Sequence, residues 1–346
     1  MDEGTALMLR ALDAARLGPE ADPNPRVGCV VADAEGRVVG VGHHRGAGSP
    51  HAEVEALAAA GGAAHGGTAY VTLEPCDHTG RTGPCSRALV EAGLSRVVFA
   101  VADPDPAAAG GATTLEAAGV AVEGGLLEDQ AEDLNASWLH ARRTGRPWVV
   151  AKSASTLDGR VAAVDGSSRW ITGEAARADV HTLRARCGAV VVGTGTALAD
   201  DPQLTVRGTE GSDAVRGTDG RGAARQPLRV VVGHRPLPAG ARLLDGTAET
   251  LVLATRDPAE VLATLHARGI HRVLLEGGPT LSAAFLAAGL VDEVVAYVAP
   301  ALLGAGPSVT ADLGVTTIAD AVRLRPTDVT VLGPDVRITA RPLARS

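Results

Sequence analysis

The chain has 346 residues, of which 45% are hydrophobic and only 2% aromatic, and its formal net charge is −8. This length is enough for two domains of ordinary size, with cores built mainly from Ala, Val and Leu. The acidic balance argues against a nucleic-acid-binding protein, because such a protein needs a face rich in Lys and Arg.

The N-terminal stretch predicts an amphipathic helix over residues 5–17, which Gly18 and Pro19 end. The stretch lacks the charged and then apolar order of a secretory signal peptide. No run of about 18 apolar residues occurs in the chain, so we expect no membrane span. Four cysteines are typical of a reducing compartment rather than a disulfide framework, and we expect a cytoplasmic protein. Cys29 and Cys187 are expected to fill cores.

The next elements alternate between strands and helices, which is typical of a layered α/β domain. We expect a hairpin-like pair of strands over 27–32 and 37–43, a helix that begins near His51, a strand over 68–76, a helix that begins at Pro84 and a strand over 96–103. A loop, a helix and a short strand over 103–125 complete this half of the chain.

One His and two Cys in this half could meet at a single metal ion. His51, Cys76 and Cys85 supply the three protein ligands of a catalytic zinc site, which leaves the fourth position for water. Cys85 is expected at a helix N-terminus, where the helix dipole favours the thiolate that binds metal. A closed structural site with His78 as the fourth ligand is the alternative.

Glu53 stands two residues after His51, too close along the chain to be a comfortable fourth ligand of the same ion. Zinc lowers the pKa of bound water to about 7, and zinc deaminases use the hydroxide to displace an exocyclic amine while a non-ligand Glu carries protons. The H-A-E triplet at 51–53 and the P-C pair at 75–76 match the zinc deaminase signature. Eight residues rather than two separate Cys76 from Cys85, which departs from it.

Three stretches of this half resemble the deaminase half of the bifunctional riboflavin-biosynthesis deaminase/reductase family: NPRVGCVV at 24–31, PHAEVEAL at 50–57 and TLEPCDHTGRTGPC at 72–85. A long loop between the two cysteines with H-x-G-R inside it is typical of that family. The resemblance implies a cytidine-deaminase-like three-layer α/β/α domain that binds zinc, with Glu53 as the catalytic residue. It also implies four substrate-binding residues, which are Asn24, His44, His78 and Arg81. Without the resemblance, Asn24 would be interpreted as a turn residue and the two histidines as exposed loop residues.

A polar, helical connector follows over 128–147, and Gly145 and Pro147 break it. We therefore predict a first domain over residues 1–146 and a second over 147–346. A Gly- and Arg-rich polar segment at 208–227 is expected to be a mobile loop.

Strands and helices alternate again from Trp148, which predicts a second, largely parallel α/β sheet. Helices are expected at 177–187, 258–269 and 281–289, and strands at 189–193, 228–234, 250–255, 272–276 and 293–300. Glycine clusters at 193–196 and 277–280 each precede a helix, where a phosphate could approach backbone N–H groups. Neither cluster fits G-x-G-x-x-G, because Leu198 stands at the third glycine position, and each would singly be an ordinary turn.

Four stretches of this half, at 152–160, 168–173, 183–207 and 276–293, resemble the reductase half of the same family. The resemblance implies a dihydrofolate-reductase-like α/β domain that takes hydride from NADPH. The implied cofactor contacts are Ser155, Trp170, Thr196, Asp200, Gly278, Pro279 and Thr280. The implied substrate contacts are Ser168, Arg184, Leu204, Arg207 and Glu276. The two arginines suit a phosphorylated substrate, because Arg pairs well with phosphate.

Structural roles are the alternatives for several of these residues: Trp170 as a core aromatic, Arg184 as a helix surface charge and Asp200 as a turn or capping residue. The acid–base group of this half stays open between Asp200 and Lys152.

The two halves together predict a bifunctional enzyme of riboflavin biosynthesis. It would remove the 2-amino group of a diaminopyrimidinone ribosylamine phosphate and then reduce the ribosyl chain to ribityl with NADPH. We expect a phosphorylated small-molecule substrate, no nucleic-acid or membrane partner, and leave homo-oligomerisation open. A tRNA or cytidine deaminase fused to an unrelated reductase is one alternative, disfavoured by the cysteine spacing and the acidic charge. A zinc-stapled interaction module, with its fourth metal position closed, is another.

Overall fold

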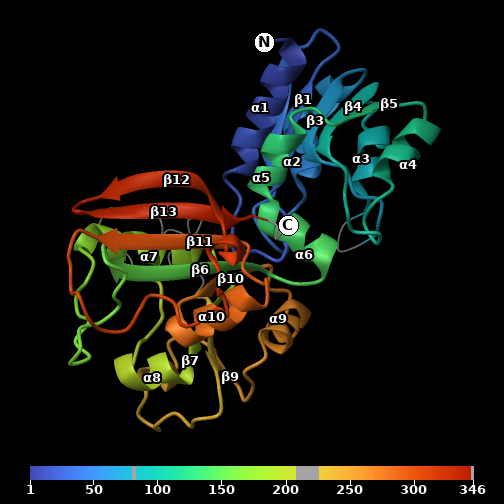
Figure 1. Ribbon diagram of the computed structural model, residues 1–346. Coiled ribbons are helices and arrows are strands. Elements are labelled where there is room, and N and C mark those ends of the chain that lie inside the picture. The colour runs from blue at the N-terminus through green and yellow to red at the C-terminus, as the bar shows by residue number, and fades with distance from the viewer. Residues whose placement is uncertain (80–82, 208–225, 344–346) are drawn as a thin grey trace. The chain divides into compact units, whose positions relative to one another are not determined.

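The computed structural model describes residues 1–79, 83–207 and 226–343 of the chain (Figure 1). Arg81 and most of the 208–227 segment therefore lie outside the described residues. The chain divides into two compact units, the first over Met1–Thr144 and the second from Gly145 onward. No helix in the described ranges has the length and apolar character that crossing a membrane requires.

The first unit is a sheet of five strands in the order β2-β1-β3-β4-β5. Its strands are β1 (Gly28–Ala32), β2 (Val38–His43), β3 (Thr68–Leu73), β4 (Arg96–Val101) and β5 (Ala121–Gly124). Its helices are α1 (Glu3–Ala15), α2 (Ala52–Ala60), the 3-10 turn η1 (Gly61–Ala64), α3 (Cys85–Glu91), α4 (Gly111–Ala117), α5 (Glu128–Leu134) and α6 (Ala136–Thr144). Strand β1 runs antiparallel to β2 and β3, whereas β3, β4 and β5 are parallel.

Helices cover both faces of this sheet, because its strands are apolar on both sides. One core joins α2, α3 and α4 to the face formed by side chains such as Val31 and Val71. The other joins α1, α5 and α6 to the opposite face, which includes Val30 and Val98. This confirms the three-layer α/β/α prediction.

Two glycines bring α2, the helix that begins beside the expected metal ligands, close to the sheet. A Cβ atom on Gly42 would lie 2.3 Å from the carbonyl oxygen of Ala52, and one on Gly40 would lie 2.1 Å from that of Ala56. Neither contact is possible for a larger residue, so the path of β2 under α2 requires glycine at both positions.

The second unit contains an eight-stranded sheet in the order β12-β13-β11-β6-β10-β7-β8-β9. The strands are β6 (Trp148–Thr156), β7 (Ala189–Gly193), β8 (Leu228–Val232), β9 (Thr250–Leu253), β10 (Arg272–Leu275), β11 (Glu293–Ala299), β12 (Leu324–Leu332) and β13 (Asp335–Pro342). The helices are α7 (Glu174–Ala185), α8 (Thr194–Asp200), α9 (Pro258–Ala267) and α10 (Pro279–Ala287), with 3-10 turns η3 (Arg242–Leu244) and η4 (Ile318–Asp320).

Six neighbouring strands of this sheet, from β11 to β9, are parallel, which confirms the predicted pattern. Helices α9 and α10 pack on one face and α7 and α8 on the other. The antiparallel hairpin of β12 and β13, which extends the sheet beyond β11, is absent from the predicted elements. The helix expected from Pro84 begins one residue later, since Pro84 is the N-cap of α3.

Candidate active sites

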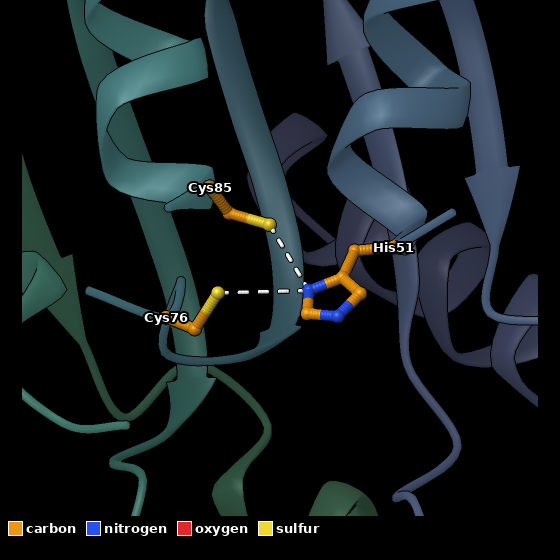
Figure 2. Close-up of side chains that lie close together, drawn as sticks. All are labelled: His51, Cys76 and Cys85. Carbon is orange, nitrogen blue, oxygen red and sulfur yellow. Dashed lines mark hydrogen bonds between the residues drawn. The ribbon is translucent and has the colours of Figure 1, made fainter. Parts of the chain in front are cut away.

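Three potential metal ligands from separate segments of the first unit meet at one point. His51 is the N-cap residue of α2, Cys76 follows β3, and Cys85 is the first residue of α3. Their ligand atoms all lie within 4.8 Å of one another, and Figure 2 shows the three side chains converging. The Nδ1 atom of His51 is 3.5 Å from the sulfur of Cys76 and 3.2 Å from the sulfur of Cys85.

This geometry fits a tetrahedral zinc ion. Zn–S bonds of about 2.3 Å and Zn–N bonds of about 2.0 Å place neighbouring sulfur and nitrogen ligands about 3.5 Å apart. Hydrogen bonds from Cys85 and His51 lower the pKa of the Cys76 thiol, against the opposing effect of burial. The alternative with a fourth protein ligand is not supported, because His78 is exposed and is not part of this group.

Glu53 lies in the first turn of α2 with only 4% of its surface exposed. Burial raises the pKa of its carboxyl group to about 7, and a side-chain hydrogen bond with Cys85 opposes that shift. A buried carboxyl group that changes protonation near neutral pH, beside a site for a metal-bound water, can take up and release protons.

A cavity of about 380 Å³ opens onto this group. Its lining includes His51 and Cys76 and also three of the predicted substrate-binding residues, Asn24, His44 and His78. The volume suits a small heterocyclic molecule. Arg81 belongs to the same predicted set but lies outside the described residues.

His44 and Asn24 form a hydrogen-bonded pair in the cavity wall. The Nδ1 atom of His44 is 3.0 Å from the carbonyl oxygen of Pro50, which can only accept, and Nε2 is 3.0 Å from the amide nitrogen of Asn24. In the neutral ring that arrangement makes Nδ1 the donor and Nε2 the acceptor. The carbonyl oxygen of Asn24 is then left as an acceptor for another donor.

The two glycine clusters of the second unit are neighbours, since β7 and β10 pair in the sheet. Thr196 in α8 accepts a hydrogen bond from the backbone N–H of Gly278 at 3.0 Å, and Gly278 is the N-cap of α10. Pro279 and Thr280 form the first turn of that helix. The structure therefore brings together four of the predicted cofactor contacts at the carboxyl ends of two parallel strands.

A buried ion pair lies beside this edge. Arg184 on α7 makes a bidentate pair with Glu276 after β10, at 2.5 and 2.9 Å, and also donates to the carbonyl oxygen of Thr205. The Arg184 side chain is only 12% exposed, so its interpretation as a surface charge is wrong. Lys152 on β6 interacts electrostatically with both residues, and burial lowers the pKa of its ammonium group.

The remaining predicted residues of this unit occupy mixed positions. Ser155 is buried on β6, Leu204 is buried with a φ of 54°, Ser168 is half-buried, and Asp200 and Arg207 are exposed. Trp170 is 71% exposed, which contradicts a core role, and the guanidinium of Arg177 lies 4.6 Å from its ring centroid.

Sequence reasoning did not single out His181. Its Nδ1 atom lies 3.2 Å from the carbonyl oxygen of Thr205 and 3.2 Å from the backbone nitrogen of Arg207, so it holds the segment that carries two predicted substrate contacts. Its position on α7, one helical turn before Arg184, is the signal that could have identified it.

The fold and the sites define a deaminase with a zinc-binding centre joined to a reductase. Residues 1–101 match the model of the cytidine and deoxycytidylate deaminase zinc-binding region, and residues 147–338 match the RibD C-terminal domain. The riboflavin biosynthesis protein RibD of Mycobacterium tuberculosis is 50% identical over 318 residues, which cover 92% of this chain and 91% of the relative. The corresponding protein of Escherichia coli is 41% identical, covering 95% and 96%.

Solved structures agree over the whole length. The RibD structure from Acinetobacter baumannii has a TM-score of 0.90 and 41% identity, with 99% of each chain covered. The diaminohydroxyphosphoribosylaminopyrimidine deaminase/5-amino-6-(5-phosphoribosylamino)uracil reductase from Thermotoga maritima has a TM-score of 0.87 and 32% identity, again with 99% of each covered. The chain belongs to the RibD family of riboflavin biosynthesis, whose members are bifunctional deaminases and reductases that use zinc and NADPH.

Proposed function

We propose that residues 1–146 deaminate a phosphorylated diaminopyrimidinone ribosylamine at C2, and that residues 147–346 then reduce its ribosyl chain to ribityl. The observation that carries the first assignment is the meeting of His51, Cys76 and Cys85 beside buried Glu53 at the cavity. The name of the Thermotoga maritima relative, which covers both reactions, supports the substrate class.

In the deaminase, His51, Cys76 and Cys85 would hold zinc, which supplies a water molecule whose pKa is lowered to about 7. Glu53 would carry one proton from that water to the pyrimidine ring as the water oxygen bonds to C2. It would then carry the proton of the added hydroxyl group to the 2-amino group, which leaves as ammonia when the C2–N bond breaks. Asn24, held by His44, would accept a hydrogen bond from an N–H group on the edge of the base. His78 and Arg81 would contact the rest of the substrate, with Arg81 suited to its phosphate.

In the reductase, the N-terminus of α10 from Gly278 to Thr280, together with Thr196, Ser155, Trp170 and Asp200, would bind NADPH. Ser168, Leu204, Arg207, Glu276 and Arg184 would form the substrate side. Arg184 already pairs with Glu276, so we assign it to positioning that carboxylate, and exposed Arg207 to the phosphate. Lys152 is a better candidate for the proton donor than Asp200, because it is half-buried, interacts with Glu276 and has a pKa that burial lowers.

The deaminase assignment can be tested with three variants. Glu53→Gln should abolish deamination and keep one equivalent of zinc, whereas Cys85→Ser should lose the zinc and the activity together. Glu55→Gln is the matched control, since Glu55 lies on the same helix but pairs with Arg45. Loss of zinc in Glu53→Gln would make Glu53 a ligand, and full deamination by zinc-free Cys85→Ser protein would refute the mechanism.

Two further proposals concern the cellular compartment and the oligomeric state of the protein. All four cysteines are free thiols and two of them belong to the proposed zinc site, which supports a reducing, cytoplasmic location. Homo-oligomerisation stays a prediction, which a light-scattering mass of the full chain would test.

A further inference from the structure

The two proposed zinc-binding cysteines come from different segments, and a set of hydrogen bonds ties these segments together. Cys76 lies in an irregular stretch after β3, and eight residues separate it from Cys85 at the start of α3. Each cysteine is followed by a hydrogen-bonding residue, Asp77 and Ser86 respectively. The Ser86 hydroxyl donates to Asp77 Oδ1 at 2.5 Å, and the Ser86 backbone N–H donates to the Cys76 carbonyl oxygen at 3.2 Å.

A third element holds the same carboxylate from the other side. The Thr114 hydroxyl on α4 donates to Asp77 Oδ2 at 2.8 Å, and the backbone N–H of Asp77 donates to the carbonyl oxygen of Ala108 at 2.8 Å. Both oxygens of Asp77 are therefore engaged by hydroxyl groups.

Helix α4 is itself fixed against the end of β3. Buried Glu74 accepts hydrogen bonds from the backbone N–H groups of Gly110 and Ala112 at 3.3 and 3.1 Å. A Cβ atom on Gly111 would lie 1.8 Å from the carbonyl oxygen of Pro75, so the helix approaches this segment as closely as only glycine allows. Thr114 is thus a rigid support for Asp77 rather than a chance contact.

We infer that Asp77, Ser86 and Thr114 form a thiolate brace, which sets the spacing of Cys76 and Cys85 before zinc binds. The inference rests on the proposed zinc site. None of the three residues belongs to the group of potential metal ligands, and none lines the cavity. Asp77 is therefore a positioning residue. Hydrogen-bonded partners that orient metal ligands typically change metal affinity by about 10–100-fold when they are removed.

The chemical reason is the geometry that a tetrahedral ion demands. The metal must hold two sulfur atoms and one ring nitrogen at fixed separations. If the segment that carries Cys76 were free to move, ordering it would reduce the free energy of zinc binding. In the braced protein that ordering is complete before the metal arrives. The brace therefore acts on zinc affinity and on the coordination geometry, and through them on deamination.

The test compares zinc affinity, measured by competition with a chromophoric chelator, in the wild-type protein, Asp77→Ala and Asp77→Asn. The dissociation constant of Asp77→Ala should rise by about 10–100-fold. Asp77→Asn should recover most of the affinity, because its amide can accept from Ser86 and donate to the Thr114 hydroxyl. Ser86→Ala, which removes one hydrogen bond, should lie between wild type and Asp77→Ala.

Asp33→Ala is the control, because Asp33 also bonds backbone N–H groups and an arginine but in the turn between β1 and β2. It should lower the unfolding temperature of the zinc-free protein and leave zinc affinity unchanged. The absorption spectrum of the cobalt-substituted protein, which reports thiolate coordination, should change in Asp77→Ala and not in Asp33→Ala.

Unchanged zinc affinity and cobalt spectrum in Asp77→Ala, with only a loss of stability like that of Asp33→Ala, would overturn the brace. If Asp77→Ala does not fold, Ser86→Ala decides by the same two measurements. A wild-type protein that binds no zinc would instead refute the proposed metal site itself, so the two failures are distinguishable.

Discussion

Arg229 offers a sharp test of how the second unit is held together. Its side chain is 1% exposed on β8, and its guanidinium donates to five acceptors, among them the carbonyl oxygens of Arg242 at 3.2 Å and Ala248 at 2.5 Å. It also pairs with Asp245 at 3.0 Å. Replacing Arg229 with Met keeps a long apolar side chain in the core and removes every donor.

The cost can be worked from these contacts. A buried acceptor left without a partner costs about 1–3 kcal/mol, and the backbone carbonyl oxygens of three residues, Gln203, Arg242 and Ala248, lose this donor. The Asp245 pair adds little, since that side chain is 26% exposed and exposed pairs contribute about 0–1 kcal/mol. With some packing recovered by Met, we expect a loss of about 3 kcal/mol. For a unit of this size that lowers the unfolding temperature by about 6–12 °C.

Calorimetry of the full chain measures this shift. Arg268→Met is the matched control, because its pair with Glu249 is 43% and 69% exposed, and its stability should stay within about 0.5 kcal/mol of wild type. An Arg229→Met protein that loses less than about 1 kcal/mol would show that these carbonyl oxygens find other partners. Equal losses in both variants would refute the role of burial.

Two further predictions concern the second unit. The pKa of Asp158 is lowered to about 2, first by the Thr156 hydroxyl and then by the Gly304 backbone N–H, and its unfolded value is about 3.9. Its stabilisation is therefore present above about pH 4 and is lost as the pH falls toward about 2. Acid unfolding of Asp158→Asn should show a weaker pH dependence across that window, and an unchanged dependence would refute the assignment. Lys152→Met should lower the kcat of NADPH-dependent reduction by about 10²–10⁴-fold while deamination is unaffected; a normal kcat would exclude Lys152 as the proton donor.

The arrangement that sequence analysis recovers best is the metal group. His51, Cys76 and Cys85 are chemically distinctive, and the residues around them match a family signature, so their meeting in space could be predicted without knowing the path between them. The thiolate brace could not be predicted from the sequence. Thr114 is 37 residues from Asp77 along the chain, and neither a Ser, a Thr nor an Asp in a loop signals a partner that far away.

The hairpin of β12 and β13 was missed for a different reason. Most of β12 is exposed, and Pro326 interrupts it where the pairing register shifts. An edge strand with a proline carries little of the apolar alternation on which strand prediction depends. Its pairing with β13 is evident only in the sheet, where β13 also pairs with β11.

Two buried glutamates show how the surroundings of a carboxyl group set its task. Glu276 forms a bidentate pair with Arg184, and this pairing lowers its pKa although burial acts in the opposite direction. Glu53 instead lies beside sulfur atoms and in a buried helix turn, and burial raises its pKa to about 7. A carboxylate that stays ionised suits a fixed role in binding and charge compensation, whereas one that titrates near neutrality suits proton transfer. We therefore assign proton transfer to Glu53 and positioning to Glu276, because Arg184 lowers the pKa of Glu276, whereas burial is the largest influence on the pKa of Glu53.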